Sequence, residues 1–233
     1  MRTVQILFLT IVFGCGKTDA PSEQDGKLTG TVRDMSGSPI NGVTILVDNS
    51  ILFNSNLTTR SDPEGRYSIN MPKAGAWFAF AMINKQFHGK TYQCFLHPDD
   101  PQGFGSEGGI RNFTWRLSGQ KALPLSGYYG GTITVDHFPG LYLDTEKIEF
   151  TLIPESRLID GTEGQPLKRN ANDGVQIVDI PIGRYRISAK YGNEILKLRK
   201  WNTDEGFVKE LTFDFEPQID SQCDNCFKLE YNR

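Results

Sequence analysis

Residues 28–34 read Leu-Thr-Gly-Thr-Val-Arg-Asp, and residues 43–48 read Val-Thr-Ile-Leu-Val-Asp. Apolar and polar side chains alternate along the first segment, as in a strand with one buried face. The segment between them, residues 35–42, is dense in Gly, Ser, Asn and Pro, which favour turns. The sequence therefore predicts two strands that follow each other across a turn.

More strands are predicted toward the C-terminus, at residues 57–60, 66–71, 76–82 and 112–117. The turn before the second of these contains Pro63-Glu64-Gly65, in which Pro pre-sets one torsion and Gly supplies a positive φ. Gly and Pro recur at turn-like spacing throughout the chain, while helical periodicity is scarce. This pattern favours an all-β protein.

The second half of the chain repeats the pattern. Residues 131–136 echo residues 30–34, and residues 147–154 alternate in the same way. The last strands are predicted at residues 209–215 and 227–231.

The spacing of turn residues repeats as well. Gly174 lies seven residues before Pro181, as Gly65 lies seven before Pro72. A Gly and then an aromatic residue follow each Pro, and the aromatics are Trp77 and Tyr185. We therefore expect these two aromatic residues to lie in the cores of two β-sandwiches of the same kind.

The first half resembles a known family. Residues 30–34, 37–45 and 59–69, followed by Pro72 and Gly75, are similar to the carboxypeptidase regulatory-like domain. The resemblance covers residues 27–117 and implies a transthyretin-like (prealbumin-like) β-sandwich, also described as a carbohydrate-binding-like fold. It implies a non-catalytic accessory module. Residues 84–111 depart from the family pattern, and we expect a long insertion there.

The first sixteen residues indicate export. Arg2 precedes an apolar run of about ten residues, which is typical of a secretory signal peptide and too short to span a bilayer. The run ends on Gly14-Cys15, which resembles the lipobox of bacterial lipoproteins. That resemblance implies cleavage before Cys15 and lipidation of Cys15. An ordinary signal peptide cut further along is the alternative.

The predicted organisation has four parts. They are a signal peptide (1–14), a lipidated tether (15–26), a first β-sandwich (27–118) and a second β-sandwich (123–233). Gly16 follows the Cys where some lipoproteins carry an Asp that retains them in the inner membrane. By this resemblance the outer membrane is expected, with either its periplasmic or its outer face left open.

The charge of the chain argues against some partners. The full sequence has a net charge of −3, and loss of Arg2 leaves 24 basic against 28 acidic residues, or −4. A mildly acidic protein is a poor match for nucleic acid or anionic lipid as the main partner.

Three cysteines remain beside Cys15. Cys223 and Cys226 could close a small disulfide ring, or one of them could reach Cys94, and an exported protein permits either bond. The C-x-x-C pair lies near the C-terminus of a β-rich chain, so a thioredoxin-like redox role is not favoured. No second C-x-x-C motif exists to complete a zinc site.

The sequence shows no convincing catalytic constellation, so we expect no enzyme activity, no cofactor and no metal. Cys94 and His97, with His88 and Asp99, have the types and spacing of a zinc site, but a packed strand cysteine and solvated loop histidines are the simpler interpretation. The carboxylates of Asp100 and Glu107 lack the ordered spacing of a calcium loop.

Exposed aromatic residues could stack on sugar rings. Tyr128, Tyr129 and Trp201 lie near predicted turns and are the candidate glycan contacts. The expected function is that of a lipid-anchored cell-envelope protein, acting as a non-catalytic binding or scaffold module on an envelope protein or glycan. The alternative is a carbohydrate-binding surface lipoprotein of a glycan-uptake system.

Overall fold

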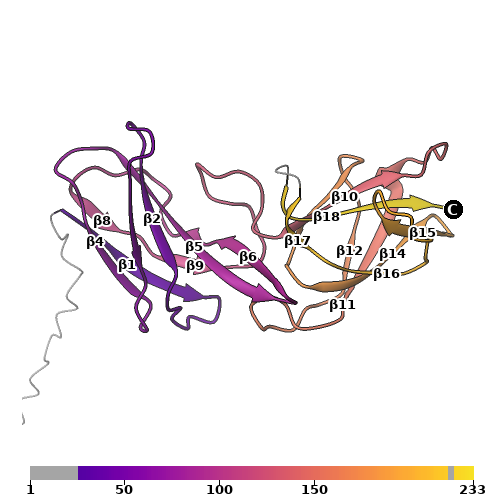
Figure 1. Cartoon of the computed structure of the whole chain (residues 1–233), viewed down its shortest axis with the longest axis horizontal. Coiled ribbons are helices and arrows are strands. Elements are labelled where there is room, and N and C mark those ends of the chain that lie inside the picture. The colour runs from indigo at the N-terminus through magenta and orange to yellow at the C-terminus, as the bar shows by residue number, and fades with distance from the viewer. Residues whose placement is uncertain (1–25, 220–222) are drawn as a thin grey trace, which may run out of the picture.

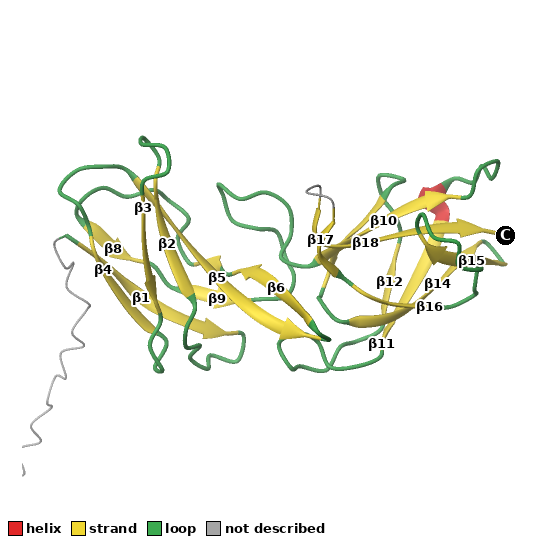
Figure 2. Ribbon diagram, viewed as in Figure 1, coloured by secondary structure: helices red, strands yellow, loops and turns green. Residues whose placement is uncertain are grey.

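The computed structural model describes residues 26–219 and 223–233, and the chain within them is almost entirely β-structure (Figure 2). The predicted signal peptide, Cys15 and the tether up to residue 25 lie outside the described residues. Within these residues the single helical element is the short 3-10 helix η1 (Thr145–Lys147). No helix there has the length and apolar character needed to cross a lipid bilayer.

The first unit consists of two packed sheets. One contains β1, β4, β7, β8 and β9 in the order β4-β1-β9-β7, with β8 beside β1. Their bounds are β1 (Lys27–Asp34), β4 (Arg66–Asn70), β7 (His97–Pro98), β8 (Gly108–Ile110) and β9 (Phe113–Trp115). The other has the order β3-β2-β5-β6. Its strands are β2 (Thr44–Asn49), β3 (Asn56–Arg60), β5 (Trp77–Phe87) and β6 (Lys90–Phe95).

The second unit forms one continuous sheet in the order β12-β11-β14-β15-β18-β10-β13. Beside this path, β16 pairs with β14 and β17 pairs with β18. The bounds are β10 (Gly131–His137), β11 (Ile148–Pro154), β12 (Leu167–Arg169), β13 (Gln176–Ile180), β14 (Arg184–Tyr191), β15 (Glu194–Lys200), β16 (Leu211–Asp214), β17 (Glu216–Ile219) and β18 (Cys223–Asn232).

The strand order of the first unit recurs in the second. In each, the opening strand lies between an antiparallel neighbour, β4 or β13, and a parallel one, β9 or β18. The orders β3-β2-β5-β6 and β12-β11-β14-β15 also correspond. The difference lies in β15, which pairs with β14 through Leu196 and with β18 through Leu198, and so joins the two layers. The repeated spacing in the sequence therefore reflects a repeated topology.

Alternating side chains build the cores, as the period-two pattern requires. In β2, Ile45 and Val47 are fully buried, while Thr44, Leu46 and Asp48 are half-buried. Trp77 and Tyr185 are 3% and 1% exposed, so each is a core residue of its unit.

The expectation of a long insertion at residues 84–111 is partly wrong. β5 continues to Phe87, and β6 returns from Lys90 in a hairpin whose two turn residues, His88 and Gly89, have φ of 46° and 79°. Two consecutive positive φ values are the mark of a type I′ turn, which matches the twist of paired strands. Only the later part of the segment is loop, around the short strands β7 and β8.

Candidate functional site

The β5–β6 hairpin of the first unit packs against the second unit. The hydroxyl of Tyr92 donates a hydrogen bond to the backbone carbonyl of Phe215, with an O···O distance of 2.6 Å. Tyr92 is fully buried, and its burial raises the pKa of its hydroxyl above the ordinary range. The hydroxyl therefore stays protonated and remains a donor.

Charged groups surround this hydrogen bond. Lys90 Nζ lies 2.8 Å from a carboxylate oxygen of Glu216, and His88 Nδ1 lies 2.7 Å from one of Asp214. All of these side chains are at least two-thirds removed from solvent. A buried hydrogen bond with charged contacts around it fixes one geometry between two elements. Figure 1 shows the two units end to end along one elongated body, with β6 beside β17 at their junction.

A second contact joins the units at His97. Its Nδ1 lies 3.0 Å from the hydroxyl of Tyr129, and the two rings meet edge to face at 5.7 Å between centroids. The pKa of His97 is lowered, chiefly because burial disfavours the charged imidazolium. Arg116 lowers it further and Asp99 opposes the shift.

A cavity of about 260 Å³ lies at the junction, between β6 and the first residues of β18. Its lining includes Cys94, Lys121, Tyr129 and Asn225. Cys94 is a free, buried thiol. Burial raises its pKa to about 11, although Lys85 and Lys121 oppose the shift.

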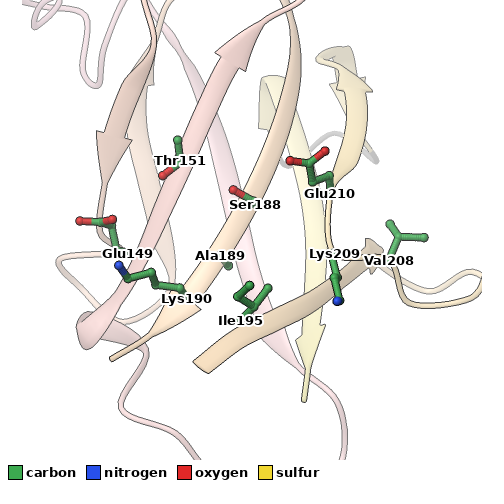
Figure 3. Close-up of a pocket in the computed structure, with 9 residues that line it drawn as sticks. All are labelled: Glu149, Thr151, Ser188, Ala189, Lys190, Ile195, Val208, Lys209 and Glu210. Atoms are coloured by element: carbon green, nitrogen blue, oxygen red, sulfur yellow. The ribbon is translucent and has the colours of Figure 1, made fainter. Parts of the chain in front are cut away.

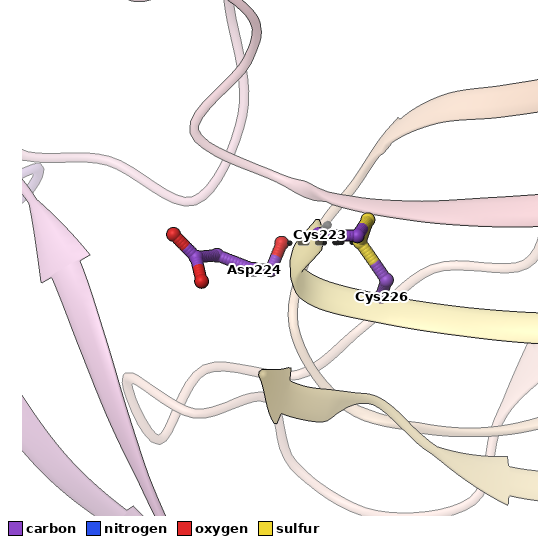
Figure 4. Close-up of a disulfide and its surroundings, with 3 residues drawn as sticks. All are labelled: Cys223, Asp224 and Cys226. Atoms are coloured by element: carbon purple, nitrogen blue, oxygen red, sulfur yellow. Dashed lines mark hydrogen bonds between the residues drawn. A yellow bond between two sulfur atoms is a disulfide. The ribbon is translucent and has the colours of Figure 1, made fainter. Parts of the chain in front are cut away.

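Cys223 and Cys226 are joined by a disulfide at the start of β18, with their Cα atoms 5.9 Å apart (Figure 4). Asp224, which also lines the junction cavity, lies between them in sequence and points its carboxylate away from the sulfurs. The disulfide thus joins the residues on either side of Asp224 and Asn225, which line the cavity.

A groove with a volume of about 610 Å³ lies on the second unit (Figure 3). β14 pairs with β16 up to Ile187 and with β15 from Ala189, so Ser188 falls where the two partner strands separate. Figure 3 shows Lys190 on one side of the groove and Lys209 on the other.

Apolar and charged groups share this groove. Ile195 and Val208 are 58% and 42% exposed. Glu149 and Glu210 are already paired, with Lys168 at 3.0 Å and Arg186 at 3.3 Å. A few polar groups around apolar side chains are typical of sites that bind small ligands. Sequence reasoning missed this groove because it arises only where two strands part.

The three predicted glycan contacts are not brought together. Trp201 is 42% exposed and borders a shallow pocket of about 230 Å³, with Lys228 Nζ 5.3 Å from its ring centroid. Tyr128 is 41% exposed but does not line that pocket. Tyr129 is only 7% exposed and its ring packs against His97, so little of it is open to a ligand outside the junction cavity.

The side chains weighed as metal ligands have other partners. His88 contacts Asp214, His97 contacts Tyr129, and both carboxylate oxygens of Asp99 accept hydrogen bonds from Asn112. In residues 26–219 and 223–233, no three His, Cys, Asp or Glu side chains gather closely enough to hold a metal ion.

No protein-family model and no curated protein matches the chain. Several solved structures align with most of the chain. The Bacillus anthracis TIE protein is 13% identical with a TM-score of 0.35, over 89% of this chain and 34% of that one. The minor pilin GBS52 of Streptococcus agalactiae is 10% identical with a TM-score of 0.27, over 88% and 97%.

A single B repeat unit of the collagen-binding surface protein of Staphylococcus aureus is 10% identical with a TM-score of 0.25, over 89% and 98% of the two chains. These similarities concern the fold alone and not the function of the chain.

Proposed function

We propose that the chain is a lipid-anchored cell-envelope protein that acts without catalysis, as a scaffold that presents its second unit for binding. The junction carries this proposal. Tyr92, Lys90 and His88 connect the first unit to β16 and β17, so the two units behave as one elongated body. A stiff body attached at its N-terminal end holds its far unit at a defined distance from the surface.

The anchor is the first part of the proposal to test. Two or more acyl chains give stable membrane attachment, whereas one gives only marginal binding. We expect the mature N-terminus to be an acylated Cys15 in mass spectra, and the chain to sediment with membranes. Cys15→Ser should move it to the soluble fraction, and Cys94→Ser should not. An unmodified N-terminus on the native protein would refute the anchor.

Carbohydrate binding is the second candidate function, and Trp201 favours it. Trp201 is 42% exposed, and Asn202 and Thr203, whose polar groups suit sugar hydroxyls, line the same pocket. We expect polysaccharide pull-down by the parent chain to be lost in Trp201→Ala and kept in Tyr142→Ala, which removes an aromatic that is 85% exposed elsewhere. Equal retention by both variants would exclude Trp201 as a sugar platform.

A further inference from the structure

The loop between β2 and β3 exposes three large apolar side chains in a row. Ile51, Leu52 and Phe53 are 71%, 60% and 102% exposed. The other exposed large hydrophobics in the described chain are scattered, and no others occur three in a row. Scattered apolar residues are normal on a protein surface, but a cluster marks a contact. We call residues 50–55 the apolar tip.

The backbone of the apolar tip is held in place. Asn49, which is 7% exposed, accepts hydrogen bonds through Oδ1 from the backbone N–H groups of Ile51 and Leu52, at 2.8 and 2.9 Å. Asn54 adopts a φ of 54°, which turns the chain back toward β3. These contacts keep the three apolar side chains pointing outward, so the tip protrudes as a fixed feature.

The charge of the apolar tip fits a lipid surface. Residues 49–56 read Asn-Ser-Ile-Leu-Phe-Asn-Ser-Asn and contain no Asp, Glu, Lys or Arg. Insertion between lipid headgroups would therefore desolvate no charge. Exposed Leu and Phe on a polar scaffold are the side chains that enter the interface between headgroups and acyl chains.

The apolar tip lies at the end of the first unit where the chain arrives from Cys15. The β4–β5 loop connects the two places: Met71 N donates to the carbonyl of Gly26 at 2.8 Å, and Ser50 N donates to that of Ala76 at 2.8 Å. Eleven residues, 15–25, precede Gly26. Fully extended they reach at most ~36–40 Å, so an acylated Cys15 and the apolar tip can share one membrane surface.

The second unit lies at the other end of β5. Trp77 at its start pairs with Asn49 beside the apolar tip, whereas Phe87 at its end leads into His88, which contacts the second unit. Figure 2 shows the β2–β3 loop on the part of the molecule away from the C-terminus. We infer that the apolar tip inserts into the lipid surface that holds the anchor, and so sets the orientation of the scaffold. This inference rests on the proposed lipid anchor.

The test uses Trp fluorescence on the full, lipidated chain reconstituted with phosphatidylethanolamine and phosphatidylglycerol vesicles. Phe53→Trp reports on the apolar tip, and Met35→Trp is the matched control. Met35 is 70% exposed and directly follows β1, at the opposite end of the same sandwich. Difference spectra against the parent remove the signals of the native tryptophans.

We expect the emission of Trp at position 53 to shift to the blue and to be quenched by brominated lipid, because insertion brings the side chain to the acyl chains. The emission of Trp at position 35 should stay unchanged. Adding Ile51→Ser and Leu52→Ser to Phe53→Trp should reduce the quenching. These residues are exposed, so the melting temperature serves as a check that the fold is intact.

Vesicle flotation separates the two proposals. A chain that floats while position 53 remains unquenched retains its anchor and overturns the inserted tip. A chain that does not float refutes the anchor. In that case excess vesicles are added, and the quenching of Trp at position 53 shows whether the apolar tip inserts without the anchor. A blue shift that depends on protein concentration without vesicles would assign the apolar tip to a second copy and overturn the inference.

Discussion

At the scale of single residues, burial shifts the pKa values of several groups at the junction, among them Cys94 and His97. Cys94 is held as a neutral thiol and His97 as a neutral imidazole. Cys94 belongs to the buried core and lines the junction cavity, and His97 contacts Tyr129 across the junction. The reactivity of Cys94 and the proton uptake of His97 should therefore differ measurably between the folded and the unfolded chain.

The thiol of Cys94 should react slowly in the native protein. A pKa of about 11 leaves little thiolate near neutral pH, and thiolate is the reactive form. In the Cys15→Ser chain, we expect modification by a disulfide reagent at pH 7.5 to be at least roughly 100-fold slower than in denaturant. Cys94→Ser should abolish the reaction in both conditions. Equally fast modification of the folded chain would contradict the burial.

His97 should make stability depend on mild acid. Its folded pKa lies below the ordinary value of about 6.5, so the unfolded chain takes up the proton first as pH falls. Stability is therefore present above pH 6.5 and is lost as pH falls toward the folded pKa.

We expect urea unfolding to show a smaller free energy at pH 5.5 than at pH 7.5, and His97→Gln to narrow that difference. The carboxylates with lowered pKa, such as Asp62 and Asp173, lose their contribution only below about pH 4.5. If His97→Gln leaves the difference in unfolding free energy between pH 7.5 and pH 5.5 unchanged, other groups cause the acid sensitivity.

At the scale of elements, the opening strands β1 and β10 depend on a glycine at the same place in the repeat. A Cβ on Gly30 would overlap the carbonyl oxygen of Arg111, and one on Gly131 would lie 2.7 Å from that of Asn225. In each unit a strand or loop crosses close to the opening strand, and only Gly leaves room for it.

We expect Gly30→Ala and Gly131→Ala each to lower the free energy of unfolding by about 1–3 kcal/mol, because backbone atoms must shift. Gly206 has open space around it and no positive φ, so Gly206→Ala is the matched control and should be close to neutral. Thermal or urea unfolding measures all three. Unchanged stability of both opening-strand variants would show that the backbone yields more easily than its contacts suggest.

At the scale of the whole molecule, the β5–β6 hairpin determines how the two units are oriented. The turn His88-Gly89 was grouped with an insertion at the level of sequence. A two-residue turn ending in Gly between alternating segments is a hairpin signal and could have been recognised. The contacts of that hairpin could not be predicted, because Asp214 and Phe215 lie more than a hundred residues away in the chain.

Loosening the junction should let the units move independently. We expect the combined variant His88→Ala, Lys90→Ala and Tyr92→Phe to show a broader range of maximum dimensions in small-angle scattering. In NMR relaxation, the two units should tumble with separate correlation times. Gln86→Ala removes a side chain that bonds only to Thr91 within the hairpin, and it should change neither readout. Rigid tumbling of the triple variant would show that the orientation is fixed elsewhere.

The sequence by itself determined the all-β class, most strand positions and the duplication, because a period of two and the Gly and Pro spacing are local properties of the backbone. Trp77 and Tyr185 were assigned to the cores correctly on that basis. Only the tertiary structure decided the rest. It buried Tyr129 against His97, opened the groove where β15 and β16 part, and placed the apolar tip at the same end of the first unit as Gly26. These features join residues that are distant in the chain, and side-chain periodicity carries no information about which distant strands meet.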